Sequence, residues 1–154
     1  MSSENDVVTV ERMIAAPPEA IFALLVDPNR HQDIDGSETV REVKGHAKPL
    51  ELGNTFGMSM HHGFSYSTVN TVVEYEENRR FAWQTRGAAR IVANVGGQIW
   101  RYELEAVDGG TLVRESWDLT QATSFIRPLV RRGASQTREN MTATLAHIDD
   151  LVTS

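Results

Sequence analysis

Apolar and polar residues alternate with a period of two through the middle of the chain and with a helical period at its end. The alternation is clearest at residues 100–106 (WRYELEA), where aromatic or aliphatic side chains take one face and charged side chains the other. Comparable strands are predicted at 7–14, 56–62, 69–75, 81–85 and 111–119. Met141, Leu145 and Ile148 then recur at helical spacing, which predicts a long terminal helix.

Prolines divide the part of the chain that follows the first strand. The pair at 17–18 ends that strand, and its second member suits the first turn of a short helix over 18–26. The Asp-Pro pair that comes next is typical of an N-cap and predicts a second short helix over 28–33. Pro128 either limits the terminal helix to the residues after it or kinks it, which leaves the backbone of residues 124–133 open.

The predicted elements follow one another as a strand, two short helices, about six strands joined by hairpin turns, and one long helix. This order is typical of an α+β protein with an antiparallel sheet of six or seven strands. Such a sheet needs one face covered, and the terminal helix is the long amphipathic element available to cover it. Because the 154 residues contain no internal repeat or linker, we expect a single domain over residues 1–154.

The composition excludes several kinds of chemistry. The chain has no cysteine, which removes disulfides, thiolate metal sites and a cysteine nucleophile. Its formal net charge of -6 opposes binding to the phosphate backbone of a nucleic acid. No signal-peptide pattern and no apolar run long enough for a membrane span is seen, so we expect a cytoplasmic protein.

Several segments match the turns and packing positions of a known superfamily. They are APPEAIF at 16–22, LVDP at 25–28 with His31, VNTV at 69–72, RRFAW at 79–83, RYELE at 101–105, DGGT at 108–111 and ESWD at 115–118. With these segments and its terminal helix, the chain resembles the SRPBCC superfamily of helix-grip proteins, in particular a bacterial branch labelled polyketide cyclase/dehydrase. The resemblance implies a curved sheet that grips the last helix around an elongated apolar cavity for a hydrophobic small molecule. The resemblance assigns no catalytic residues, because the members of the superfamily do not share a common set of them.

Inward-facing aromatic and polar side chains are the candidates for lining such a cavity. The candidate ligand-binding residues are Met58, Met60, His62, Tyr66, Asn70, Trp83, Trp100, Tyr102 and Trp117. The uncharged stretch 53–73 suits strands whose inner face meets a ligand of mixed apolar and polar character. The aromatic residues among them are equally consistent with a core filled by its own side chains.

His61 and His62 are adjacent, so on a strand they point to opposite faces and cannot bind the same metal ion. The phase of Met58 and Met60 favours His62 as the one that faces the cavity. There it would act as an acid, a base or a hydrogen-bonding partner of a ligand. The alternative is a histidine that is exposed or satisfied within the core.

Glu115 is the second candidate for proton transfer. It shares a strand face with Val113 and Trp117, which predicts a carboxyl group inside an apolar cavity, where burial raises its pKa. The alternatives are a bulge or an arginine partner on a neighbouring strand, Arg101 or Arg114.

Three functions compete at this point. The first is a binding or carrier protein for a hydrophobic small molecule such as a lipid, a polyketide or an aromatic metabolite. The second is a polyketide cyclase or dehydratase-like enzyme that uses His62 and Glu115 as acid and base. The third is a regulatory or partner-binding module. We expect no metal and no cofactor, and the sequence leaves a homodimer open.

Overall fold

The computed structural model describes residues 6–36, 40–44, 48–61, 65–87, 96–125 and 127–154. Its elements are, in order, β1 (Val7–Ile14), α1 (Pro18–Leu25), the 3-10 turn η2 (Pro28–Arg30), α2 (His31–Ile34), β2 (Val40–Lys44), β3 (Thr55–His61), β4 (Ser65–Glu76), β5 (Arg80–Gly87), β6 (Gly96–Val107), β7 (Gly110–Asp118), α3 (Arg127–Arg131) and α4 (Ala134–Thr153). This order confirms the predicted α+β arrangement.

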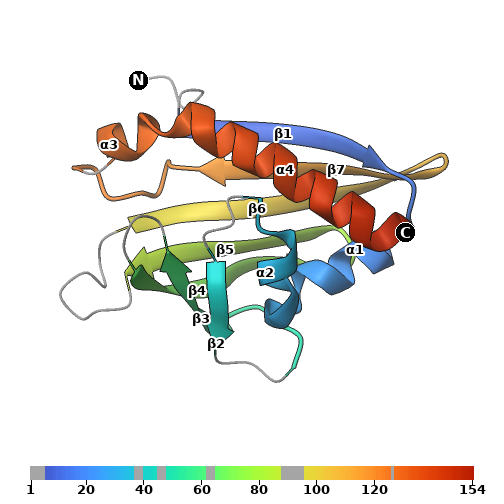
Figure 1. Cartoon of the computed structure of the whole chain (residues 1–154), viewed down its shortest axis with the longest axis horizontal. Helices are drawn as coiled ribbons and strands as arrows, with labels where there is room; N and C mark the ends of the chain where they lie inside the picture. The colour runs from blue at the N-terminus through green and yellow to red at the C-terminus, as the bar shows by residue number, and fades with distance from the viewer. Residues whose placement is uncertain (1–5, 37–39, 45–47, 62–64, 88–95, 126) are drawn as a thin grey trace.

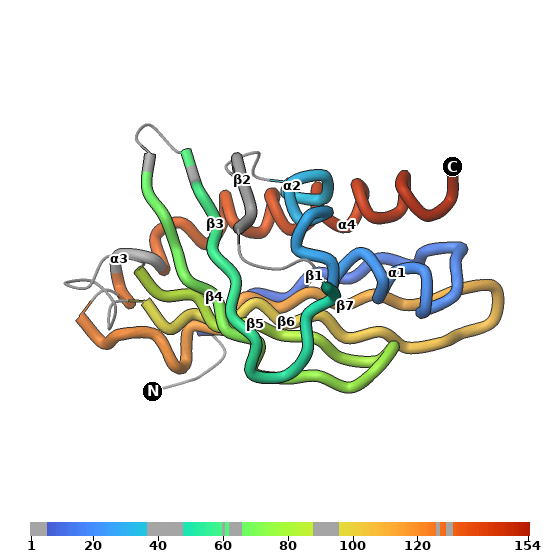
Figure 2. Tube along the Cα trace, turned by 90° about the horizontal axis from the view of Figure 1, so that it is seen from below, coloured from blue at the N-terminus to red at the C-terminus, as the bar shows by residue number. Residues whose placement is uncertain are grey.

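One antiparallel sheet of seven strands, in the order β1-β7-β6-β5-β4-β3-β2, forms the body of the protein. Sequence neighbours pair from β2 to β7, and β1 lies beside β7 at the edge. The short helices carry the chain from one edge of the sheet to the other (Figure 1). The sheet curves upward at β3 and β4, and α4 lies above its concave face (Figure 2). The predicted helix-grip architecture is therefore confirmed.

The helical segments differ from the sequence-based expectation in detail. The expected second short helix is split into η2 and the single turn α2, with Asp27 Oδ1 accepting a hydrogen bond from the Asn29 amide. Pro128 occupies the second position of the separate short helix α3, where its missing amide hydrogen costs nothing. Of the two arrangements left open for Pro128, the structure therefore has a long helix that begins only after it, at Ala134.

Two hydrophobic clusters divide the described interior. The larger one joins α1, α2 and the C-terminal half of α4 to the sheet, around side chains such as Ile21, Phe81 and Ile148. The smaller one lies under the N-terminal half of α4 and consists of Val8, Trp117, Leu119, Ala122 and Met141. Trp100 is partly buried and packs against both clusters. The boundary between them is therefore the part of the concave face where inward side chains keep some exposure.

Gly36 brings the end of α2 into contact with α4. Its amide donates a hydrogen bond of 2.8 Å to Thr144 Oγ1. A Cβ atom added at Gly36 would lie 2.0 Å from the Asn140 carbonyl oxygen and 2.6 Å from the Thr144 amide nitrogen. Both neighbours are helix backbone, so they cannot move aside as a flexible side chain can. The close approach of α2 to α4 therefore requires glycine.

We expect Gly36→Ala to lower the free energy of unfolding by about 3 kcal/mol, the upper end of what overpacking costs, because α2 must move away from α4. Urea denaturation measures this change. Gly53→Ala is the matched control, since its Cβ would meet open space and only its positive φ of 86° is strained, at about 1 kcal/mol. Equal losses in the two variants would contradict the steric role of Gly36.

Candidate functional site

Strand register gathers aromatic and acidic side chains on the concave face of β5, β6 and β7. Tyr102 lies opposite Glu115, and Trp100 lies opposite Trp117 on one side and Trp83 on the other. The indole rings of Trp100 and Trp117 stack, with centroids 5.8 Å apart and 25° between their planes. Glu115, Trp117 and Tyr102 are at most 3% exposed, whereas Trp100 is partly exposed. These residues form the candidate site.

Glu115 carries a carboxyl group that burial keeps protonated. Removal from water is the main cause that raises its pKa to about 8, and the negative charge of Asp35 at the end of α2 raises it further. A hydrogen bond with Tyr102 acts in the opposite direction but does not compensate. The Oε1 atom of Glu115 is buried and has no hydrogen-bond partner among the described residues. At neutral pH the site therefore holds a carboxylic acid with one oxygen unused.

Neither arginine considered from the sequence pairs with Glu115. Arg101 points to the outer face, where its Nη2 lies 2.6 Å from Glu74 Oε2. Arg114 is bound to Glu11 on β1, with 2.6 Å between Nη2 and Oε2. Both arginines alternate with the inward row of their strands, so their side chains cannot reach the buried carboxyl group. This is why burial rather than an ion pair sets its pKa.

The indole nitrogen of Trp117 is a second buried polar atom of the site. It has no hydrogen-bond partner in the described part of the structure. Because Trp117 follows Glu115 by two residues on the same strand, both side chains point to the same face. One row of β7 thus presents a carboxyl oxygen and an N–H group that no described atom of the chain satisfies.

The polar group on β4 is different, since its hydrogen bonds are made within the chain. Asn70 is 1% exposed; its Oδ1 accepts a bond of 2.7 Å from Thr85 Oγ1, and its Nδ2 donates to the Phe56 carbonyl oxygen at 3.3 Å. Met58, 7% exposed, belongs to the larger hydrophobic cluster. The ligand-binding role predicted for Asn70 and Met58 stays a prediction.

His31 is a buried histidine that the sequence indicated only through its place in the family-like segment. Its ring stacks on Trp83, with centroids 5.0 Å apart and 20° between planes. Nε2 lies 2.7 Å from the Leu25 carbonyl oxygen, so it carries the proton, and Nδ1 has no described partner. Burial lowers the pKa of His31, which keeps the ring neutral.

The remaining candidates, Met60, His61, His62 and Tyr66, come in the sequence at or next to the end of β3 and the start of β4. His62 is outside the described residues, as is the side chain of Met60. His61 is exposed. Tyr66 shares the inward row but is 40% exposed, and its pKa is raised by partial burial and by the charge of Asp35. Asp35, which pattern reasoning did not single out, therefore acts on both Tyr66 and Glu115.

A charged contact fixes α3 beside the smaller cluster. The buried carboxylate of Asp6 pairs with Arg131 and lies 3.9 Å from Arg127 Nη1. Arg127 Nη2 also donates to the Ala122 carbonyl oxygen at 2.9 Å. These arginines hold the loop after β7 and the start of the chain together, at the N-terminal end of α4.

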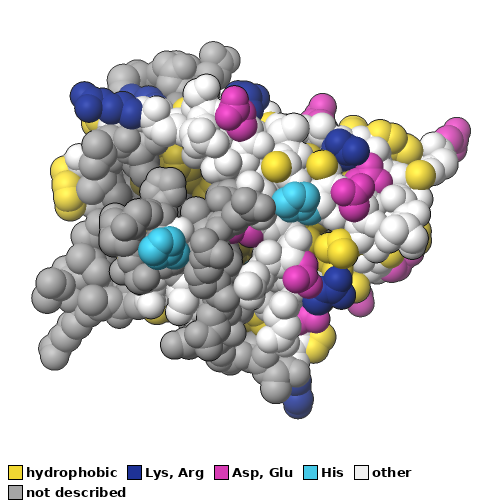
Figure 3. Space-filling model, in the orientation of Figure 1, with side chains coloured by type: hydrophobic (Ala, Val, Ile, Leu, Met, Phe, Trp, Pro, Cys, Tyr) yellow, Lys and Arg dark blue, Asp and Glu magenta, His cyan; other side chains and the backbone are white. Residues whose placement is uncertain are grey.

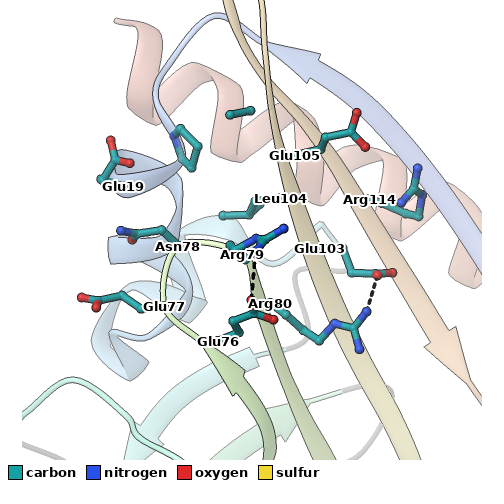
Figure 4. A pocket seen from close by; sticks show the side chains of 12 residues that line it. Glu19, Glu76, Glu77, Asn78, Arg79, Arg80, Glu103, Leu104, Glu105 and Arg114 are labelled. Atoms are coloured by element: carbon teal, nitrogen blue, oxygen red, sulfur yellow. Dashed lines mark hydrogen bonds and ion pairs between the residues drawn. The ribbon is translucent and has the colours of Figure 1, made fainter.

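A groove of about 680 Å³ lies elsewhere, where α1 begins and β4 turns into β5 (Figure 4). Its walls carry charges that are mostly paired. Arg80 Nη2 lies 2.8 Å from Glu103 Oε2, and Arg79 Nη1 lies 3.2 Å from Glu76 Oε1. Because paired charges in open solvent offer little to an apolar ligand, we do not assign this groove to the candidate site.

Comparisons with solved structures identify the architecture as a helix-grip fold. A Mesorhizobium loti protein of known crystal structure has a TM-score of 0.71 at 17% identity, covering 96% of both chains. An Arthrobacter aurescens protein solved in solution has a TM-score of 0.73 at 13% identity, covering 99% of this chain and 89% of that one. At such identities the likeness shows the fold alone.

Residues 6–153 match the family described as polyketide cyclase / dehydrase and lipid transport, and the chain belongs to this family. The resemblance to the SRPBCC superfamily is thus confirmed. A Mycobacterium tuberculosis protein described as uncharacterized is 31% identical over 144 residues, which are 89% of this chain and 60% of that protein. The chain therefore spans about three fifths of the length of the curated relatives that it matches.

The described residues contain no group of three or more His, Cys, Asp or Glu side chains placed to hold a metal ion. Among their helices, none is long and apolar enough to cross a membrane.

We expect Glu115→Gln to change how stability depends on pH. The folded state keeps a proton that the unfolded chain releases from about pH 4.5, so in the wild type the free energy of unfolding falls as pH rises toward about 8. The slope due to this group approaches about 1.4 kcal/mol per pH unit. The amide of Glu115→Gln has no proton to lose. The free energy of unfolding of the variant should therefore rise relative to that of the wild type between about pH 4.5 and about pH 8, as measured by urea denaturation.

Glu105→Gln serves as the control, because Glu105 is an exposed acid on the neighbouring strand β6. Its pH dependence should follow that of the wild type. Parallel curves for the wild type and Glu115→Gln would show that Glu115 ionises without cost, which contradicts its buried placement.

Proposed function

We propose that the protein binds or carries a hydrophobic small molecule on the concave face of its sheet, beneath α4. The observation that carries the proposal is a buried, neutral carboxyl group with an unused oxygen beside two stacked indoles. A core built only for stability would satisfy such a group or replace it by an apolar side chain, because an unpaired buried polar atom costs about 1–3 kcal/mol. Membership of a family described by cyclase, dehydrase and lipid transport supports the same proposal.

Partial exposure on the inward face supports access for a ligand. Trp100 is partly exposed between the two hydrophobic clusters, and Tyr66 is 40% exposed toward the free end of β3 and β4. In the space-filling view, hydrophobic side chains appear at the bottom of a hollow near the N-terminal half of α4 (Figure 3). An apolar ligand that enters there would stack on the indoles and reach Glu115.

A second candidate function is enzymatic, and the Glu115 carboxyl favours it. A carboxyl group whose pKa is about 8 can both give and take a proton near neutral pH, as a general acid or base must. In this alternative the substrate is polyketide-like and is cyclised or dehydrated, with Glu115 and His62 as the proton carriers. The proposed partner residue His62 lies outside the described residues.

The test is a screen of extracted lipids, polyketides and aromatic metabolites by native mass spectrometry and thermal shift. A ligand at about 100 times its Kd should raise Tm by about 5–10 °C. Trp100→Leu should weaken binding roughly tenfold, because it removes the stacked partner of Trp117. Tyr75→Leu is the matched control, because Tyr75 is an aromatic residue that packs against Phe22 of α1, away from the site. This variant should bind the ligand as the wild type does.

The two candidate functions differ in what becomes of the bound molecule. A carrier returns it unchanged in mass, and Glu115→Gln then alters only affinity. An enzyme converts it, and Glu115→Gln abolishes conversion while binding persists. Binding that is unaffected by Trp100→Leu, or no binding across the screen, would rule out the proposed site.

A further inference from the structure

Two unused polar atoms on one row of β7 indicate which ligands the candidate site prefers. Glu115 and Trp117 are separated by two residues along the strand, so their attachment points are about 6.6 Å apart on the same face. Both Glu115 Oε1 and Trp117 Nε1 are buried without a partner among the described atoms. Buried polar groups in native proteins are nearly always paired, so we expect this pair to have a partner beyond the described atoms.

The chemistry of the two groups restricts that partner. An indole N–H can only donate a hydrogen bond, and a protonated carboxyl group donates through its O–H. Tyr102 from β6 and the apolar Val10 from β1 lie opposite Glu115. Burial and the charge of Asp35 keep the carboxyl group protonated, although the hydrogen bond with Tyr102 favours the ionised form. The buried row of α4 consists of uncharged side chains, Met141, Thr144, Leu145 and Ile148. Two donors on the same face of β7 fit a molecule that carries acceptor oxygens.

The charge around the site argues against ionic ligands. On the inward row of β1 the next charged residue is Arg12, which is held by Asp149 with 2.8 Å between Nε and Oδ2. A carboxylate placed beside Glu115 would therefore find the negative field of Asp35 and no described cation to offset it. An ammonium group would leave the Trp117 N–H without an acceptor.

We propose that the site selects uncharged, flat apolar molecules that carry a carbonyl oxygen, with the Trp117 N–H and the Glu115 carboxyl as hydrogen-bond donors to that oxygen or to two such oxygens. It discriminates against carboxylates, free fatty acids included, and against ammonium compounds of the same skeleton. The inference rests on the proposed function, because it names the ligand class of the same site.

Four probes with one ring system test the selection: acetylnaphthalene, ethylnaphthalene, naphthoate and naphthylmethyl-trimethylammonium, all substituted at the same ring position. Dissociation constants are measured by tryptophan fluorescence and calorimetry at about pH 6.5. The ketone should bind about 3–10-fold more tightly than ethylnaphthalene, which has the same shape without the acceptor, as one or two neutral hydrogen bonds allow. Naphthoate and the ammonium compound should bind more weakly than ethylnaphthalene.

Three variants assign the preference to the two donors. Trp117→Phe keeps an aromatic ring and removes the N–H, so it should lose about 3–10-fold in affinity for the ketone and little for ethylnaphthalene. Glu115→Leu should do the same. Glu115→Gln keeps a neutral donor and should retain the preference. The unchanged affinity for ethylnaphthalene, with the circular dichroism spectrum, verifies that each variant is folded.

The pH dependence gives an independent readout. Raising the pH from about 6 to about 9.5 ionises Glu115 and removes its donor, so the wild type should lose its preference for the ketone. Glu115→Gln should keep the preference at both pH values. A wild-type preference that does not change with pH would contradict the role of the Glu115 proton.

The outcomes separate this inference from the proposed function. Equal binding of acetylnaphthalene and ethylnaphthalene, or tighter binding of the carboxylate or the ammonium probe, overturns the inference while a hydrophobic binding site stands. If none of the four probes binds at millimolar concentration, and the metabolite screen also finds no ligand, both proposals fail.

Discussion

The candidate site depends on α4 covering the concave face of a curved sheet, which takes the inward row of β7 out of water. Within that row Glu115 lies between the buried apolar side chains of Val113 and Trp117. Because no cation among the described residues pairs with it, the carboxyl group is buried in its neutral form, and its pKa is accordingly raised. The same burial keeps water away from the Trp117 N–H group. Two polar groups in one row of β7 therefore have no hydrogen-bond partner among the described residues.

The division of the interior into two clusters explains where a ligand would find room. The larger cluster packs α1, α2 and the C-terminal half of α4 onto the sheet. Its fully buried side chains, such as Phe81 and Leu145, stabilise the fold. Gly36 tightens this end by letting α2 contact the α4 backbone. The smaller cluster is bounded by the contact of Asp6 with α3. The proposed site therefore lies where the two clusters meet, at Trp100 and Trp117, while most of the larger cluster packs the helices onto the sheet.

Glu115 could be found from the sequence because strand periodicity is strict: a residue that shares a row with Val113 and Trp117 must share their face. The inward phase of Trp100 and Tyr102 follows in the same way. His31 and Asp35 could not be found by this means. They lie on a short turn of helix whose position over the sheet depends on contacts with residues about a hundred positions later in the chain, such as the bond from Gly36 to Thr144.

The sequence by itself determined the order of the elements, the faces of the strands and the family, because these depend on local periodicity, turn residues and segment similarity. Only the tertiary structure decided which charges meet. It directed Arg101 and Arg114 to acids on the outer face and brought Asp35 near Glu115. It also buried the Trp117 N–H where no described atom accepts its hydrogen bond. Electrostatic environment and hydrogen-bond satisfaction are sums over neighbours distant in sequence, so the chemistry of the site emerges only when the sheet curves and α4 closes over it.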